Sequence, residues 1–326
     1  MPDGAGMAPC PIGHDGATAG PGPGREYTVV QLAKAAFGQL WLNKRRVLAT
    51  ALGVAAVTAA VDGALGCAKT PLLDAFVVTF HALGPHALSA ASAALNALYF
   101  GLPIVPGILI LEAYKWSIIR SFDHAGPAWS DLSAPLQRPW RGSLLRLACL
   151  LAALSAAQAA AYALWMPAVA LSGGAGMPPL VVLLLAWVVA AVAVTFGRML
   201  LTMLAGPAIL QATQPTLLDG LRQNWRILRG QPRRMVAVAA IGAALFMLSD
   251  IVADMVFARL RTYADPGLAL GRFMELPWQF QKAIIDQTVY LAPLAVWCHL
   301  VAVLFRSAHG LPLEPSAHDP ETDPSA

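Results

Sequence analysis

The sequence predicts an all-α fold: a polytopic membrane protein built as a bundle of six transmembrane helices, with amphipathic helices at the cytoplasmic interface. Two observations predict it. First, 57% of the 326 residues are hydrophobic and only 12% are charged, whereas a soluble domain carries about 25% charged residues. Second, the chain contains six apolar stretches of the length that a helix needs to cross a bilayer. These properties exclude a soluble enzyme, a disordered protein and a disulfide scaffold.

Each of the six stretches predicts one transmembrane helix. They cover roughly residues 47–66, 88–112, 146–170, 179–203, 235–257 and 284–305. Residues 71–87 are also apolar, but this segment is short and contains Asp74, Gly84 and Pro85. We therefore expect residues 71–87 to lie on the membrane surface or to form a re-entrant piece, and not to be a seventh span.

The two ends of the chain differ in composition from the rest. Residues 1–26 are rich in Gly and Pro, and residues 309–326 combine several prolines with acidic side chains. Such segments bury too little apolar surface to offset the entropy cost of folding. The sequence thus predicts a disordered N-terminal tail at 1–26, a six-helix transmembrane domain at 27–308 and a disordered acidic C-terminal tail at 309–326.

The distribution of cations predicts the orientation, because cytoplasmic loops carry an excess of Lys and Arg. Most of the 22 Lys and Arg residues fall on one side of the six predicted spans: Arg25, Lys34, Lys44, Arg45, Arg46, Lys115, Arg120, Arg138, Arg141, Arg146, Arg222, Arg226, Arg229, Arg233, Arg234 and Arg306. The other side holds Lys69, Arg259, Arg261, Arg272 and Lys282. We expect a multi-pass protein of the cell inner membrane with both termini in the cytoplasm.

Local matches along the chain indicate an internal repeat. The pair Arg45-Arg46 opens the first predicted span and Arg233-Arg234 opens the fifth, and Asp62 and Asp250 follow these pairs at the same distance along the chain. Three similar units would start near residues 27, 127 and 215. Each unit would contain a basic or amphipathic segment followed by two spans, which predicts a three-fold repeat of a two-helix unit.

Two segments, 27–43 and 215–230, have the pattern of amphipathic helices. In the second, we expect Leu217, Leu218, Leu221, Trp225 and Leu228 to share one face, opposite Arg222, Arg226 and Arg229. Such helices suit the headgroup plane of a bilayer. The predicted partner is thus the lipid bilayer, with anionic phospholipid as a specific ligand; the alternative is an ordinary interfacial linker. The candidate headgroup contacts are Lys44, Arg45, Arg46, Arg222, Arg226, Arg229, Arg233 and Arg234.

One stretch resembles a known family. It contains Gly206-Pro207-Ala208-Ile209-Leu210, then Leu218, Leu221, Trp225-Arg226, Leu228-Arg229-Gly230 and Arg233. This rhythm resembles the six-span bacterial membrane proteins of the YciC type and the membrane domain attached to some glycerophosphodiester phosphodiesterases. The chain departs from the pattern at Gln223-Asn224, where a Ser is usual. The resemblance implies a six-span membrane fold; the phosphodiesterase activity of those enzymes resides in a separate soluble barrel.

Polar side chains inside predicted spans are candidate functional groups, because they are costly in a bilayer. Asp250 and Asp254 share one helical face, and with Asp62 and Asp286 they are expected at similar depth near the outer leaflet. This cluster could bind a cation or relay protons, or the helix ends could simply be wet, with Asp254 paired to nearby Arg259 or Arg261. Gln158 is expected near the midplane, where it would hydrogen-bond a neighbouring helix.

The motifs of soluble and intramembrane catalysis are missing from the sequence. It contains no GxGxxG, P-loop, GxSxG or HExxH motif, and no cysteine or histidine pattern with zinc spacing. We therefore predict a non-enzymatic integral membrane protein that interacts with lipid or assists assembly, with no metal, no cofactor and no nucleic-acid partner. The first alternative is a small permease that uses the outer-leaflet carboxylates, and the second is an intramembrane enzyme.

Overall fold

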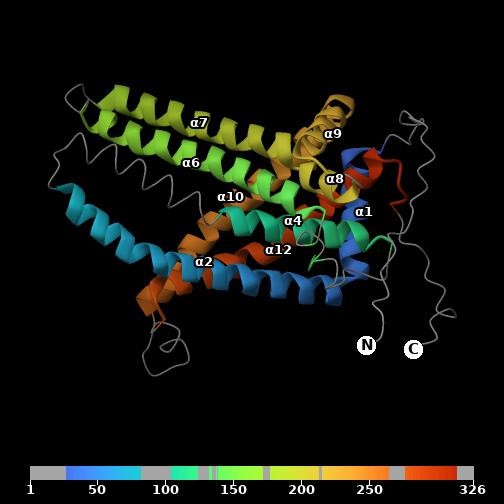
Figure 1. Cartoon of the computed structure of the whole chain (residues 1–326), viewed down its shortest axis with the longest axis horizontal. Coiled ribbons are helices and arrows are strands. Elements are labelled where there is room, and N and C mark those ends of the chain that lie inside the picture. The colour runs from blue at the N-terminus through green and yellow to red at the C-terminus, as the bar shows by residue number, and fades with distance from the viewer. Residues whose placement is uncertain are drawn as a thin grey trace.

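The computed structural model describes residues 27–81, 104–123, 132–133, 137, 139–171, 177–212, 215–263 and 276–313. Over these ranges all regular structure is helical (Figure 1). The long helices are α2 (Lys44–His81), α6 (Arg141–Leu171), α7 (Met177–Thr202), α10 (Pro232–Tyr263) and α12 (Trp278–Ala308). The shorter ones are α1 (Val29–Leu42), α4 (Ile104–Arg120), α8 (Ala205–Gln211) and α9 (Leu217–Gly230).

Four segments of the described chain are long and apolar enough to cross a membrane. They are Lys44–Ala68 in α2, Val192–Gln211 running from α7 into α8, Pro232–Leu260 in α10, and Trp278–Ala308 in α12. The prediction of an all-α membrane protein is therefore confirmed at this level. The count of six spans and the three-fold repeat stay predictions.

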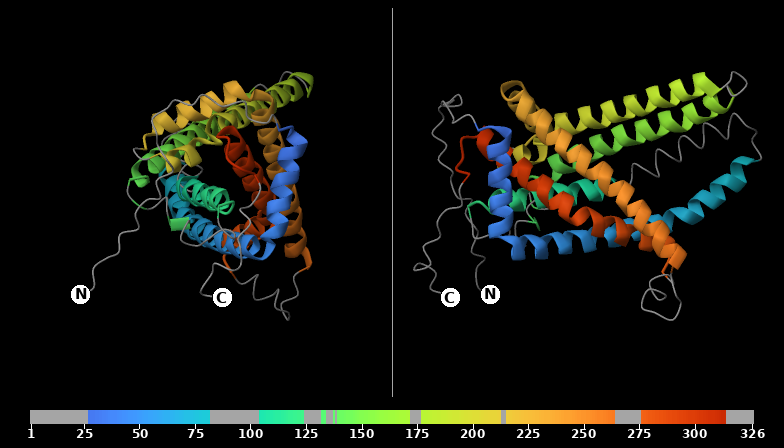
Figure 2. Two further views of the ribbon diagram at one scale, coloured as in Figure 1. Left: turned by 90° about the vertical axis from the view of Figure 1, so that its right-hand side faces the viewer. Right: turned by 180° about the vertical axis from the view of Figure 1, so that it is seen from behind.

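Helix α12 is the centre of the bundle. It packs against α1, α2, α4 and α10, and Figure 2 shows it crossing between them. Its second half, from Trp297 to Arg306, is buried throughout. Near its start, Phe280 comes so close to α2 that a Cβ atom on Gly63 would lie 2.3 Å from the ring. Glycine at position 63 thus permits the close contact between the two helices.

The described part of segment 71–87 is continuous with the first span. Residues 71–81 continue α2 through Pro71, outside its candidate span Lys44–Ala68, and residues 82–87 lie outside the described ranges. That this segment lies on the membrane surface or is re-entrant stays a prediction. The helix has 38 residues, which is about 57 Å at the usual rise and exceeds the hydrocarbon thickness of roughly 30 Å. Figure 1 shows the last part of α2 turning away from the direction of its first part.

Two cations expected at the basic membrane surface are buried instead. Lys115 lies on α4, which continues past the predicted span end at residue 112, and Arg306 lies in the last turns of α12; each is 1% exposed. Arg306 forms an ion pair with Asp123 (2.8 Å) and donates to the carbonyl of Pro312 (3.0 Å). The sequence assigns residues 309–313 to the C-terminal tail. In the structure they pack back against the bundle.

A break between α7 and α8 shapes one end of the molecule. Proline has no N–H, so Pro207 cannot donate to the carbonyl four residues earlier, that of Met203. Lys115 supplies the missing donor, with its Nζ 3.1 Å from the Met203 oxygen. At the same break, the amide of Asn224 donates to the Leu200 carbonyl (3.0 Å) and accepts from the Leu204 N–H (2.9 Å). These two backbone groups would bond to each other in an unbroken helix.

The ammonium that repairs this break is itself neutralised. Glu112, one turn earlier on α4, forms an ion pair with Lys115 (2.6 Å), and both side chains are almost fully buried. Gly206 makes room for the carboxylate, because a Cβ atom there would lie 1.8 Å from Oε2 and 2.3 Å from Cδ of Glu112. The sequence Gly206-Pro207 thus both breaks the helix and accommodates the ion pair at the break.

We predict that Gly206→Ala destabilises the protein by about 2 kcal/mol, the usual cost of overpacking a filled site. The Glu112 carboxylate cannot move away from the added methyl group without breaking its ion pair with Lys115. The matched control is Gly107→Ala on α4, where a Cβ atom meets nothing within 4 Å. Melting in detergent, followed by tryptophan fluorescence, should show a lower melting temperature for Gly206→Ala only. Equal melting temperatures for both variants would contradict the packing described here.

Candidate functional site

Helix α9 is fixed to the bundle by one side. It starts after Thr216, whose Oγ1 accepts a hydrogen bond from the Asp219 N–H (3.1 Å). Its buried residues are Gly220 and Asn224, which face the α7–α8 break. A Cβ atom on Gly220 would lie 2.6 Å from Ile209, so glycine allows α9 to lie directly against α8.

The exposed side of α9 differs from the sequence prediction. Leu218 and Trp225 were expected on an apolar face opposite the arginines, but they are 54% and 42% exposed and lie beside exposed Arg222, Arg226 and Arg229. The helix is rotated because Asn224 must reach the backbone at the α7–α8 break. Its outer face therefore combines apolar, aromatic and cationic side chains.

Helix α1 presents a similar face. It begins with a capping box formed by Thr28 and Gln31. Leu32 and Ala36 are buried in the core, whereas Val30, Phe37 and Trp41 are 64%, 54% and 69% exposed. These exposed residues and the exposed Lys34 between them follow one side of the helix.

The faces of α1 and α9 correspond in the positions that are exposed and, at three of these positions, in the type of side chain. Both helices have 14 residues, follow a threonine N-cap and are joined by a single residue to a long helix. When α1 and α9 are aligned from their first residues, Val29 and Leu217, their exposed positions also coincide. This alignment pairs Val30 with Leu218, Lys34 with Arg222, and Phe37 with Trp225.

The predicted headgroup contacts gather at these two helices. Lys44, Arg45, Arg46, Arg222, Arg226, Arg229 and Arg233 are exposed, and Arg234 is partly exposed. The Lys44 ammonium lies 4.3 Å from the centre of the Trp41 ring, and the Arg229 guanidinium lies 4.9 Å from that of Trp225. Figure 1 places α1 and α9 at the same end of the bundle. We call this end, with the exposed faces of α1 and α9, the basic end.

A partly buried histidine, His309, links α9 to the end of α12. Nδ1 of His309 donates to the carbonyl of Phe305 (2.7 Å), and Nε2 lies 2.6 Å from the side-chain nitrogen of Gln223. Because a carbonyl only accepts, Nε2 is the acceptor for Gln223. Burial lowers the pKa of the His309 imidazole, which favours this neutral state.

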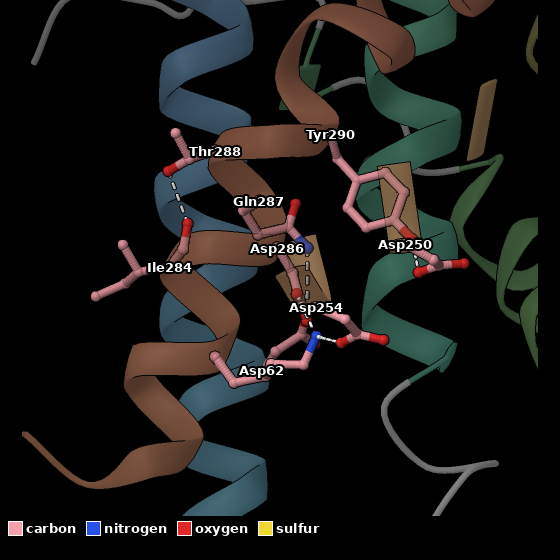
Figure 3. A network of polar contacts seen from close by, with 9 residues as sticks. Asp62, Asp250, Asp254, Ile284, Asp286, Gln287, Thr288 and Tyr290 are labelled. Carbon is pink, nitrogen blue, oxygen red and sulfur yellow. Dashed lines mark hydrogen bonds and ion pairs between the residues drawn. The ribbon is translucent and has the colours of Figure 1, made fainter. Parts of the chain in front are cut away.

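The predicted carboxylate cluster is assembled where the middle of α2, the second half of α10 and the first half of α12 meet (Figure 3). Lys282 lies at its centre, with its Nζ 2.8 Å from Asp254 and 2.6 Å from Asp286. The amide of Gln287 donates to Asp62 (3.4 Å), and the hydroxyl of Tyr290 donates to Asp250. The structure thus brings all four predicted aspartates into one polar network.

Sequence reasoning did not assign Lys282 to this network. Only Arg259 and Arg261 were considered as partners for Asp254, because they follow it on the same helix. The missed signal was local: Lys282 and Asp286 are four residues apart on α12, the spacing at which side chains of a helix meet. With four carboxylates and one ammonium, these five side chains carry a net negative charge and can attract a cation or a proton.

The remaining predicted polar residue joins two helices. Gln158 of α6 donates to Thr195 of α7 (3.4 Å), as expected for a hydrogen bond between neighbouring helices. One turn away, Arg198 of α7 donates to the hydroxyl of Ser155 on α6. In the described part of the chain, no group of three or more His, Cys, Asp or Glu side chains has the geometry to hold a metal ion.

Comparisons with known proteins add no relative: no protein-family model, curated protein or solved structure matches this chain. The resemblance to YciC-type proteins therefore stays a prediction that depends on the residues of the α8–α9 region.

We predict that Lys282→Gln lowers the melting temperature by roughly 2–4 °C, the shift that about 1 kcal/mol produces in a domain of this size class. The loss is expected because the variant leaves the Asp254 and Asp286 carboxylates close together without the ammonium between them. The matched control is Lys34→Gln, which removes an exposed lysine from α1. Equal melting temperatures for the two variants would contradict a central ion-pairing role for Lys282.

Proposed function

We propose that this chain is an inner-membrane protein with six spans and cytoplasmic termini, whose basic end binds the headgroups of anionic phospholipids. The lengths of α6 and α7, 31 and 26 residues, support two further crossings within a helical hairpin. The start of α1 and the end of α12 lie at the same end of the bundle, since α1 packs against α12. This placement supports an even number of spans. The positive-inside rule assigns that end to the cytoplasm.

The matched exposed faces of α1 and α9 carry the proposal. Exposed Phe37, Trp41, Leu218 and Trp225 are poorly suited to water, and the cations beside them are poorly suited to hydrocarbon. A helix with both kinds of side chain on its outer face is at home in the headgroup plane, where rings enter the acyl boundary and cations reach phosphates.

The correspondence of α1 with α9 supports duplication. The first part of the predicted repeat unit, α1 and α2, would recur as α9 and α10, with the Arg45-Arg46 and Arg233-Arg234 pairs at equivalent positions. The middle unit of the predicted three-fold repeat rests on Trp140, Arg141 and Arg146 alone, and stays a prediction. Two copies of an interfacial helix would give the basic end two headgroup sites.

The carboxylate network favours a second candidate function, a small permease. Three helices contribute its side chains, so a change in the protonation or cation occupancy of the network would alter the packing of α2, α10 and α12. Coupling of this kind is what an ion-driven transporter requires. A non-enzymatic role remains part of both proposals.

The first experiment measures lipid selection. We predict that wild-type protein in nanodiscs of mixed phosphatidylcholine and phosphatidylglycerol enriches the anionic lipid around it. A variant with Arg222, Arg226 and Arg229 changed to Gln should lose several-fold of this enrichment, because each cation near the surface contributes about 1 kcal/mol. Spin-labelled lipids report the enrichment directly.

The matched control is Arg259→Gln, which removes an exposed cation near the opposite end of α10. It should leave the enrichment unchanged. If the triple variant selects phosphatidylglycerol as well as wild type does, the basic end is an ordinary positive-inside rim and the proposal fails.

The second experiment tests the permease. We predict that Asp250→Asn abolishes proton- or cation-coupled flux in proteoliposomes, since asparagine keeps the shape of the side chain and can still accept from Tyr290 but carries no charge. Thr288→Val is the control: the Thr288 hydroxyl donates to the Ile284 carbonyl within α12. Flux by Asp250→Asn equal to that of wild type would remove this carboxylate from the mechanism.

A further inference from the structure

Arg198 is a charged residue inside a candidate span, and no carboxylate of the described residues forms an ion pair with it. It lies on α7 within Val192–Gln211, is partly buried, and donates one hydrogen bond, to Ser155 on α6. A guanidinium has five N–H donors. Among the described residues, Ser155 is the hydrogen-bond acceptor that the structure provides for them.

The sequence helps to explain why no countercharge lies nearby in the described part of the chain. Between Asp131 and Asp219 the chain contains no Asp or Glu, so the charged residues of α6 and α7 are all cations and α8 has none. The other helices that pack against α7 are α9 and α10. Asp219 on α9 lies 3.7 Å from Arg222, and the aspartates of α10 belong to the network at its far end. The described carboxylates thus include none within ion-pair distance of Arg198.

The depth of Arg198 suits a phosphate. Leu200, two residues further along α7, accepts a hydrogen bond from Asn224 of α9. Arg198 is therefore about 3 Å along the helix axis from the level of α9, the helix that we place among the headgroups. A guanidinium matches phosphate with two parallel hydrogen bonds. One turn deeper, the polar pair Gln158 and Thr195 continues the same seam between α6 and α7.

We infer that Arg198 and Ser155 form a site for the phosphate of a single anionic phospholipid at the seam between α6 and α7. This site is separate from the exposed faces of α1 and α9. The inference rests on the proposed function for its membrane level. It adds one specifically bound phospholipid to the general enrichment of anionic lipid that we propose for the exposed faces of α1 and α9.

The experiment counts tightly bound lipid by native mass spectrometry. Wild-type protein in detergent is titrated with phosphatidylglycerol, with phosphatidylcholine and with inorganic phosphate. We expect one phosphatidylglycerol to remain bound at high activation energy, no comparable phosphatidylcholine, and no displacement by inorganic phosphate. Arg198→Gln should weaken this binding at least tenfold. Arg198→Lys should weaken it less, because it keeps the charge but loses the planar fork.

Ser155→Ala serves as a milder second variant if Arg198→Gln fails to fold, and it should weaken the binding several-fold. Retention of the lipid by Arg198→Gln or by both milder variants overturns the inference. Displacement of the lipid by inorganic phosphate identifies a free-anion site and also overturns it. The variant with Arg222, Arg226 and Arg229 changed to Gln should keep the tightly bound lipid while losing collective selection, so failure of this site and failure of the proposed function are distinguishable.

Discussion

A backbone group without a hydrogen-bond partner is costly in a bilayer, and the structure at the basic end depends on how one such set of groups is satisfied. Pro207 removes the donor for the Met203 carbonyl, and the chain turns from α7 into α8 at that point. Two side chains from other helices complete the broken ladder: the Lys115 ammonium and the Asn224 amide. The break is therefore a junction at which α4, α7, α8 and α9 are fixed relative to one another.

This junction explains why the outer face of α9 is not the one that hydropathy predicts. Asn224 must point at the break, and Gly220, one turn earlier, must lie against α8. Both residues are weak markers of a buried face, since one is polar and the other has no side chain. Their placement turns Leu218 and Trp225 outward, so apolar side chains that would be hidden in a soluble protein lie among the arginines. In a membrane interface this arrangement carries no penalty.

The sequence predicted features that lie within one helix. It did not predict contacts that form only when two helices pack against each other. Apolar runs predicted the helices, and equal distances from the Arg45-Arg46 and Arg233-Arg234 pairs predicted that Asp62 and Asp250 would share a depth. The ion-pairing lysines Lys282 and Lys115 were missed, because their contacts to Asp254 and Met203 depend on neighbouring helices. Each also had a local signal: Asp286 is four residues from Lys282, and Glu112 is three residues from Lys115. Asn224 gave none, because no local pattern distinguishes an amide that caps another helix from an exposed one.

Some of the cations that were used to predict the orientation are buried. Lys115 and Arg306 were counted with the basic surface, yet each is enclosed by the protein and neutralised by a carboxylate. Lys282, counted on the opposite side, is likewise held between two aspartates. Such residues form ion pairs inside the protein and do not indicate which side faces the cytoplasm. The excess of cations at the basic end remains when they are left out of the count, because the cations of α1, α9 and the starts of α2 and α10 are exposed there. These exposed cations are the ones that a membrane surface can sense, so orientation and lipid selection would depend on the same side chains.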